Sequence, residues 1–283
     1  MKRRIIPMAI VMTVLIASNA FCMNIDVMMS ALEKARGSIT TVLFSINKDL
    51  SVAARRLSKV DVKGEDARQI LSNLCKGRDY VVDCAVIDPA GKMIVVEPEE
   101  YKKYEGTDVS KQAHIIKFLA DKRPVFSEVF LSVEGIEVVD FIYPVFSDKG
   151  EFLGGVSMLV RQQALTGDII APLVKGIPCK AWVMQKDGLI VYDPDPNQIG
   201  RNIFTDKLFR PFEDLVSFSE TVSRARDGAG SYDFYAKGLE DKTIVKKYAT
   251  WDTVSLYGTQ WRVIVMEVDR PAIVVNDPDK PKK

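Results

Sequence analysis

The 283-residue sequence contains a single histidine, His114, and only four cysteines. It has no Gly-x-Ser-x-Gly nucleophile motif, no phosphate-binding Gly-x4-Gly-Lys loop and no His-Glu-x-x-His metal motif. Because no Cys-x-x-Cys pair accompanies the one histidine, a structural zinc site is not expected. We therefore expect a protein that is not an enzyme and that holds no metal and no cofactor.

The sequence also lacks an excess of charge of either sign. Thirty-nine Lys and Arg residues against 38 Asp and Glu residues give a formal net charge of +1. A protein that binds nucleic acid usually carries a clear basic surplus, so we expect no nucleic-acid partner. The hydrophobic content of 47% is that of an ordinary folded protein, and the length suffices for two domains.

Residues 1–23 have the pattern of a secretory signal. Three basic residues, Lys2 to Arg4, precede a short apolar run that ends in small residues near Ala20. The segment is either a cleaved signal peptide or an uncleaved signal anchor, because the run is short for a membrane-spanning helix. Both alternatives predict a chain that is secreted or periplasmic, or is anchored to the outer face of the cytoplasmic membrane. No second apolar run follows, so we expect no output domain in this chain.

Residues 24–79 are predicted to form a long helix and a second, shorter helix at 66–74. The long helix has an apolar stripe at steps of three and four residues. The stripe consists of Leu32, Ala35, Ile39, Val42, Ile46, Leu50, Ala53 and Leu57. It is suited either to pairing with a membrane receptor or with a second copy of the chain, or to packing along the rest of its own chain. We expect a mixture, in which the early part of the helix is free for pairing and the later part packs on the domain.

A hairpin pattern occurs twice in the chain. The segment "AWVMQKDGLIVYDP", which begins at Ala181, has a counterpart in "CAVIDPAGKMIVVEP", which begins at Cys84. A helical segment and then further strands follow each copy. We expect these strands at 127–133, 137–146 and 152–160 after the first copy, and at 230–235, 243–250 and 260–266 after the second. The repeat predicts an α+β fold, in which the long N-terminal helix precedes two modules, residues 80–176 and 177–270. Each module is expected to be a mainly antiparallel sheet of about five strands flanked by helices, and a polar tail, residues 271–283, follows.

The order of these motifs resembles the extracellular double Cache sensor family, whose modules are PAS-like. The matching residues are Asp88 to Gly91, Tyr143 to Phe146, Gly150 to Gly154, Asp187-Gly188 and Ile199 to Asn202. The resemblance implies an exported sensor-type protein that binds a small polar metabolite in the membrane-distal module, here residues 80–176. The alternative is an envelope structural or interaction protein that pairs through its N-terminal helix and whose pockets are degenerate.

Asp140 is the main candidate for ligand binding. It interrupts the almost continuously apolar strand "EVVDFIYPVF", and a buried carboxylate is costly unless it is paired or used in binding. Ser127 and Ser157, on the neighbouring strands, are candidates for hydrogen bonds to the ligand. Tyr143 has the opposite parity to Asp140, so it reaches the same pocket only if a bulge precedes Pro144.

Three further candidates lie near this strand in the sequence. The resemblance implies that the helix after Gly106 covers the ligand, which makes His114 and Arg123 candidates for binding a carboxylate. Phe130 completes the predicted set. The sequence lacks the Arg-x-Trp-Tyr pattern of the family's amino-acid-binding members, so the ligand's identity stays open.

Two other patterns concern local structure. Cys75 and Cys84 are close in sequence, and in an oxidising compartment they form either a disulfide, which would clamp a helix end to the first strand, or two buried thiols. The motif Asp193-x-Asp195-x-Asn197 resembles the start of a calcium-binding loop but lacks its later Gly and Glu. We interpret it as a solvated turn that Asp193 caps.

Overall fold

The computed structural model describes residues 9–268, with side chains from residue 25 to residue 267. Residues 1–8 of the predicted signal and the predicted tail, 271–283, lie outside the described residues. In the part of the chain that is described, no helix combines the length and the apolar character needed to cross a membrane.

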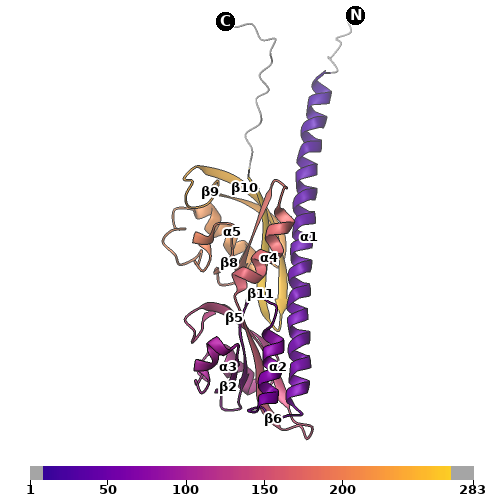
Figure 1. Cartoon of the computed structure of the whole chain (residues 1–283). Helices are drawn as coiled ribbons and strands as arrows, with labels where there is room; N and C mark the ends of the chain where they lie inside the picture. The colour runs from indigo at the N-terminus through magenta and orange to yellow at the C-terminus, as the bar shows by residue number, and fades with distance from the viewer. Residues whose placement is uncertain (1–8, 269–283) are drawn as a thin grey trace, which may run out of the picture.

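Helix α1, Ala9–Leu57, runs beside both modules (Figure 1). Its predicted stripe is buried, except that Leu43 replaces the half-buried Val42 in the core. Gly37 does not interrupt the helix. The stripe contacts both sheets, so packing along its own chain is observed. Pairing of α1 with a receptor or a second copy stays a prediction.

The first module is built on an antiparallel sheet in the order β2-β1-β6-β5-β3, with the short β4 also paired to β5. Its helical elements are α2 (Glu65–Cys75), the 3-10 helix η1 (Glu99–Tyr104) and α3 (Ala113–Asp121). Its strands are β1 (Val81–Ile87), β2 (Met93–Glu97), β3 (Val125–Phe126), β4 (Phe130–Leu131), β5 (Glu137–Phe146) and β6 (Phe152–Val160).

Helix α4, Gln162–Val174, leads into the second module, whose antiparallel sheet has the order β8-β7-β11-β10-β9. The strands are β7 (Cys179–Gln185), β8 (Ile190–Tyr192), β9 (Gly228–Tyr235), β10 (Ile244–Leu256) and β11 (Thr259–Val268). The 3-10 helix η2 (Pro196–Gln198) and α5 (Glu213–Arg224) complete the module. The predicted α+β architecture of a long helix and two antiparallel modules is therefore confirmed.

The strand expected at 127–133 is wrong. The chain forms only two two-residue strands here, β3 just before this region and β4 within it, and leaves the sheet between them. Ser127 uses its hydroxyl to accept the backbone N–H of Asp140 at 2.8 Å, and the N–H of Val129 donates to Gln185 Oε1 of the second module at 2.6 Å. These side-chain bonds replace a regular strand ladder, so the segment becomes a loop that reaches toward the second module.

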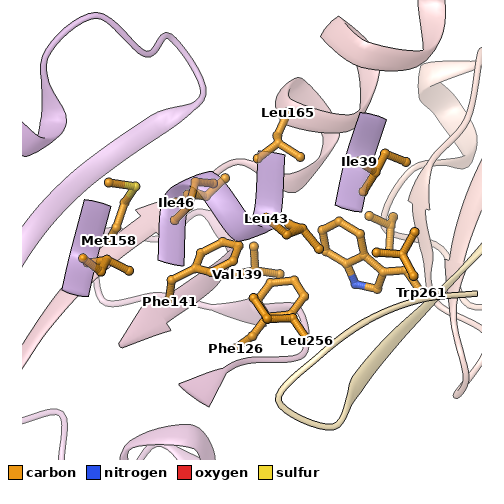
Figure 2. Packing of buried hydrophobic residues seen from close by; sticks show 14 of the residues in the cluster. Ile39, Leu43, Ile46, Phe126, Val139, Phe141, Met158, Leu165, Leu256 and Trp261 are labelled. Carbon is orange, nitrogen blue, oxygen red and sulfur yellow. The ribbon is translucent and has the colours of Figure 1, made fainter. Parts of the chain in front are cut away.

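One hydrophobic core joins α1 to both sheets. Figure 2 shows Ile39, Leu43 and Ile46 of α1 close to residues of both modules. The ring of Phe126 lies 4.4 Å from that of Phe141 and 5.1 Å from that of Trp261, measured between centroids. Because Phe126 and Phe141 belong to the first module and Trp261 to the second, the aromatic contact crosses the boundary between them.

Cys75 at the end of α2 and Cys84 in β1 form a disulfide, with their Cα atoms 6.0 Å apart. The bridge fixes α2 to the face of the first sheet that also carries α1. The opposite face of that sheet is covered by α3, whose Ile115 and Phe118 are buried against Ala85 and Ile142. This second face positions the candidate site.

Candidate ligand-binding site

The register of the first sheet brings two carboxylates to one face. Leu159 of β6 is paired with Asp83 of β1 on one side and with Asp140 of β5 on the other. Residues directly opposite each other on neighbouring strands point to the same face of a sheet. Ser157, two residues before Leu159, shares that face. All three side chains therefore lie on the side of α3, away from α1.

Asp140 is held by neighbouring side chains that the sequence had suggested. It is 2% exposed, and its Oδ1 accepts a hydrogen bond from Ser157 Oγ at 2.6 Å. The Nε2 atom of His114, on α3, lies 3.4 Å from Asp140 Oδ2. The ring of Phe130 lies 4.2 Å from that of His114, between centroids. With Ser127 bonded to the Asp140 backbone, five of the seven predicted residues come together.

Two further carboxylates belong to this site, and the sequence analysis missed both. Asp83 is 1% exposed, and Glu134 comes from the turn between β4 and β5. Among the described residues, Asp83 Oδ2 and both carboxylate oxygens of Glu134 are buried without a hydrogen-bond partner. Burial raises the pKa of Asp83 well above its usual range, and the negative charges of Glu134 and Asp140 raise it further. The negative charge of these carboxylates is therefore not compensated within the site, and a bound cation or a proton would compensate it.

The three carboxylates line a small cavity of about 20 Å³, which Ile115, Phe130 and Ser157 also border. A larger open groove of about 630 Å³ lies beside it, between α3, the loop at 127–129 and the β10–β11 turn. Gln112 and Phe130 border both spaces. Since one water-sized group needs about 10–15 Å³ measured in this way, the inner cavity has room for a single small head group.

Tyr143 and Arg123 are not brought to this site. Tyr143 lies on the opposite face of β5, against the α1 core, because the register shift in this strand falls after Val145 and not before Pro144. Arg123 is exposed just beyond α3 and borders neither space. In the described part of the chain, no group of three or more His, Cys, Asp and Glu side chains is arranged to hold a metal ion.

Comparison with known proteins finds a family model and solved structures to which this chain is similar. Residues 41–162 match the family model described as "HK/GC/Chemotaxis protein-like, sensor domain". An extracellular ligand binding receptor from Desulfohalobium retbaense has a similar structure, with a TM-score of 0.72 and 27% identity over 85% of this chain. The chain therefore has the fold of the double Cache sensor domains, and its residues 41–162 match a sensor-domain family model. The predicted resemblance is confirmed.

Other sensor domains share the fold at lower identity. The periplasmic sensory domain of the Campylobacter jejuni chemoreceptor Tlp1 has a TM-score of 0.59 and 14% identity, over 90% of this chain and 98% of that one. The ligand-binding domain of the Pseudomonas aeruginosa chemoreceptor PctB has a TM-score of 0.62 and 15% identity, over 86% and 94%. This chain spans 40% of the Desulfohalobium receptor chain. A comparison with curated proteins finds no match.

Proposed function

We propose that this double Cache domain is an exported sensor that binds a small cationic amine in its first module, residues 80–176, with Asp140 as the principal contact. The observation that carries the proposal is the group of three carboxylates, Asp83, Glu134 and Asp140, around one buried cavity. Transferring such charges out of water is costly unless a partner compensates them. The imidazole of His114 is the only basic side chain of the described residues that lies against this group.

An ammonium head group satisfies what these carboxylates lack. It carries a positive charge and three N–H donors, and it is close to water in size, as the inner cavity of about 20 Å³ requires. In this proposal the ammonium lies among the carboxylates, and the rest of the ligand extends past Phe130 into the adjacent groove, which Ser127 and His114 line. The groove therefore restricts the size of this part of the ligand much less than the inner cavity restricts the size of the head group.

The similar structures are consistent with an amine as the recognised group. PctB is in complex with L-Arg, a related Pseudomonas aeruginosa receptor with GABA, and Mlp24 with asparagine. Each of these molecules carries an amino group. We carry over only the amino group to the ligand of this chain. The described site offers no free basic side chain beside Asp140 that could bind a ligand carboxylate.

The test is titration calorimetry of the purified full chain against short alkylamines and diamines, with Asp140→Asn as the variant. The substitution keeps the size of the side chain and removes its charge, so amine affinity should fall at least tenfold, as expected for a charged hydrogen bond worth about 1.5–3 kcal/mol. Asp148→Asn, in the exposed β5–β6 turn, is the matched control and should leave the affinity unchanged. An amine that binds Asp140→Asn as tightly as the unchanged chain would contradict the proposal.

A further inference from the structure

The second module contains a cavity of its own, of about 60 Å³, which the proposed amine site does not use. Its apolar walls are Trp182 of β7, Tyr232 and Phe234 of β9, and Met266 of β11. The charged residues that line the cavity include Lys247 of β10 and Asp193 of the loop after β8. Aromatic walls around a few charged groups are typical of small-molecule sites.

Lys247 is a buried ammonium without a partner among the described residues. It is 4% exposed, and the register of β10 places it opposite Tyr232. Its Nζ lies 5.2 Å from the centroid of the Phe234 ring and 6.0 Å from that of Tyr232. Burial lowers the pKa of Lys247 to about 8. Cation–π contacts offset only part of the cost of burying such a charge, so an anion in the cavity would stabilise it.

Asp193 does not supply that anion directly. Its Oδ1 accepts hydrogen bonds from the backbone N–H of Asp195 at 2.7 Å and from Gln198 Nε2 at 3.2 Å, and it forms no ion pair with Lys247. Burial raises the pKa of Asp193 to about 7, which weakens it further as a counter-ion. Lys180 and Lys237 also border the cavity, while Asp195 is bonded to the N–H of Leu239.

We propose that this cavity is a second ligand site, and that it binds a small carboxylate whose charge pairs with Lys247. At about 10–15 Å³ for each water-sized position, about 60 Å³ accommodates a ligand of roughly four to six heavy atoms. The aromatic walls suit a short alkyl chain. The carboxylate belongs either to a simple short-chain acid or to a compact amino acid, whose amino group would donate to Asp193. The site does not depend on the amine site of the first module.

The experiment is titration of the full chain with acetate, propionate, glycine and β-alanine. The chain should bind at least one of them, and Lys247→Met, which removes the charge with little change in volume, should weaken that binding at least tenfold. Lys246→Met is the matched control, because Lys246 is the exposed neighbour on the same strand. Binding should also survive in Asp140→Asn, which separates this site from the one in the first module.

Asp193→Asn distinguishes the two sources of the carboxylate. If the ligand is a compact amino acid, glycine or β-alanine binding falls in this variant, whereas binding of acetate or propionate is retained. Should Lys247→Met fail to fold, magnetisation transfer between ¹³C-labelled acetate or propionate and the ring protons of Trp182 or Tyr232 tests the unchanged chain. Absence of binding by all four probes, binding indifferent to Lys247→Met, or a bound probe remote from these rings would overturn the proposal.

Discussion

The single residues with the greatest consequence are the carboxylates that flank Leu159. Asp140 accepts a hydrogen bond from Ser157. The Oδ2 atom of Asp83 has no hydrogen-bond partner among the described residues, and the carboxylates of Glu134 and Asp140 lie close to it. A protonated Asp83 relieves both the cost of burial and the repulsion. Without a ligand, Asp83 is therefore expected to take up a proton. With an amine bound, the ammonium group would supply the positive charge instead.

Asp83→Asn tests this interpretation through pH. Because the folded-state pKa of Asp83 is raised above the ordinary value of 3.8, the stability that it contributes is complete below that value and is lost as the pH rises toward the folded pKa. Asparagine has no such loss. In urea unfolding without ligand, the free energy of unfolding of the variant should therefore increase relative to that of the unchanged chain as the pH rises. Asp79→Asn, exposed before β1, is the control. A difference that does not change with pH would contradict the assignment.

The sequence signal for these residues was uneven. Asp140 was found because it interrupts an apolar strand, and Asp83 interrupts "VVDCAVI" in the same way. Applying that criterion to every strand would have found both. Glu134 had no such signal, since Glu134-Gly135 is typical of a solvated turn. Asp193 accepts a hydrogen bond within its turn, as interpreted. The cavity that Asp193 lines was not predicted, because the sequence does not show which of the two adjacent lysines, Lys246 and Lys247, points into the protein.

At the scale of elements, α1 organises the chain because one stripe of its surface serves both sheets. Residues 32 to 57 are buried at helical spacing, and α1 contacts β5 and β6 of the first module and β10 and β11 of the second. Leu43 is 1% exposed in the middle of this core, whereas its neighbour Phe44 is 54% exposed. Adjacent positions on one helix therefore differ almost completely in burial.

Leu43→Ala should lower the free energy of unfolding by about 2–5 kcal/mol, because it removes buried methyl groups and leaves a cavity. Phe44→Ala deletes a larger side chain on the outer face of the same turn and should change the free energy by less than about 0.5 kcal/mol. Urea unfolding of the two variants measures this difference. A loss for Phe44→Ala that equals the loss for Leu43→Ala would show that the outer face of α1 is also buried in solution.

The elements were predictable to different degrees for physical reasons. β5 and β6 have the expected bounds because long apolar runs between turns leave few alternatives. β10 continues to Leu256, beyond the expected end at 250, because residues 247–256 pair with β11. The loop after β3 was not predictable, since Ser127 and Val129 form bonds to Asp140 and Gln185 that only the folded chain brings near.

At the scale of the whole molecule, the two modules are joined beside the proposed amine site. The loop that carries Ser127 and precedes Phe130 is bonded to Gln185, and the carbonyl of Phe126 accepts a hydrogen bond from Thr259 Oγ1 at 2.6 Å. The hydrophobic core continues across the same boundary through Phe126 and Trp261. A ligand that stabilises this loop should therefore stabilise the second module as well.

The three tryptophans allow a test, because Trp182, Trp251 and Trp261 all belong to the second module. An amine that binds the first module at about 100 times its Kd adds about 2.7 kcal/mol to the free energy of unfolding. If the shared core makes unfolding a single transition, tryptophan fluorescence and far-ultraviolet dichroism should report the same increase in midpoint. In Asp140→Asn, whose affinity is at least tenfold lower, the same amine concentration should add about 1.4 kcal/mol or less and raise both midpoints by correspondingly less. Two separate transitions, with the tryptophan midpoint unmoved by the amine, would show that the modules unfold independently despite the core that joins them.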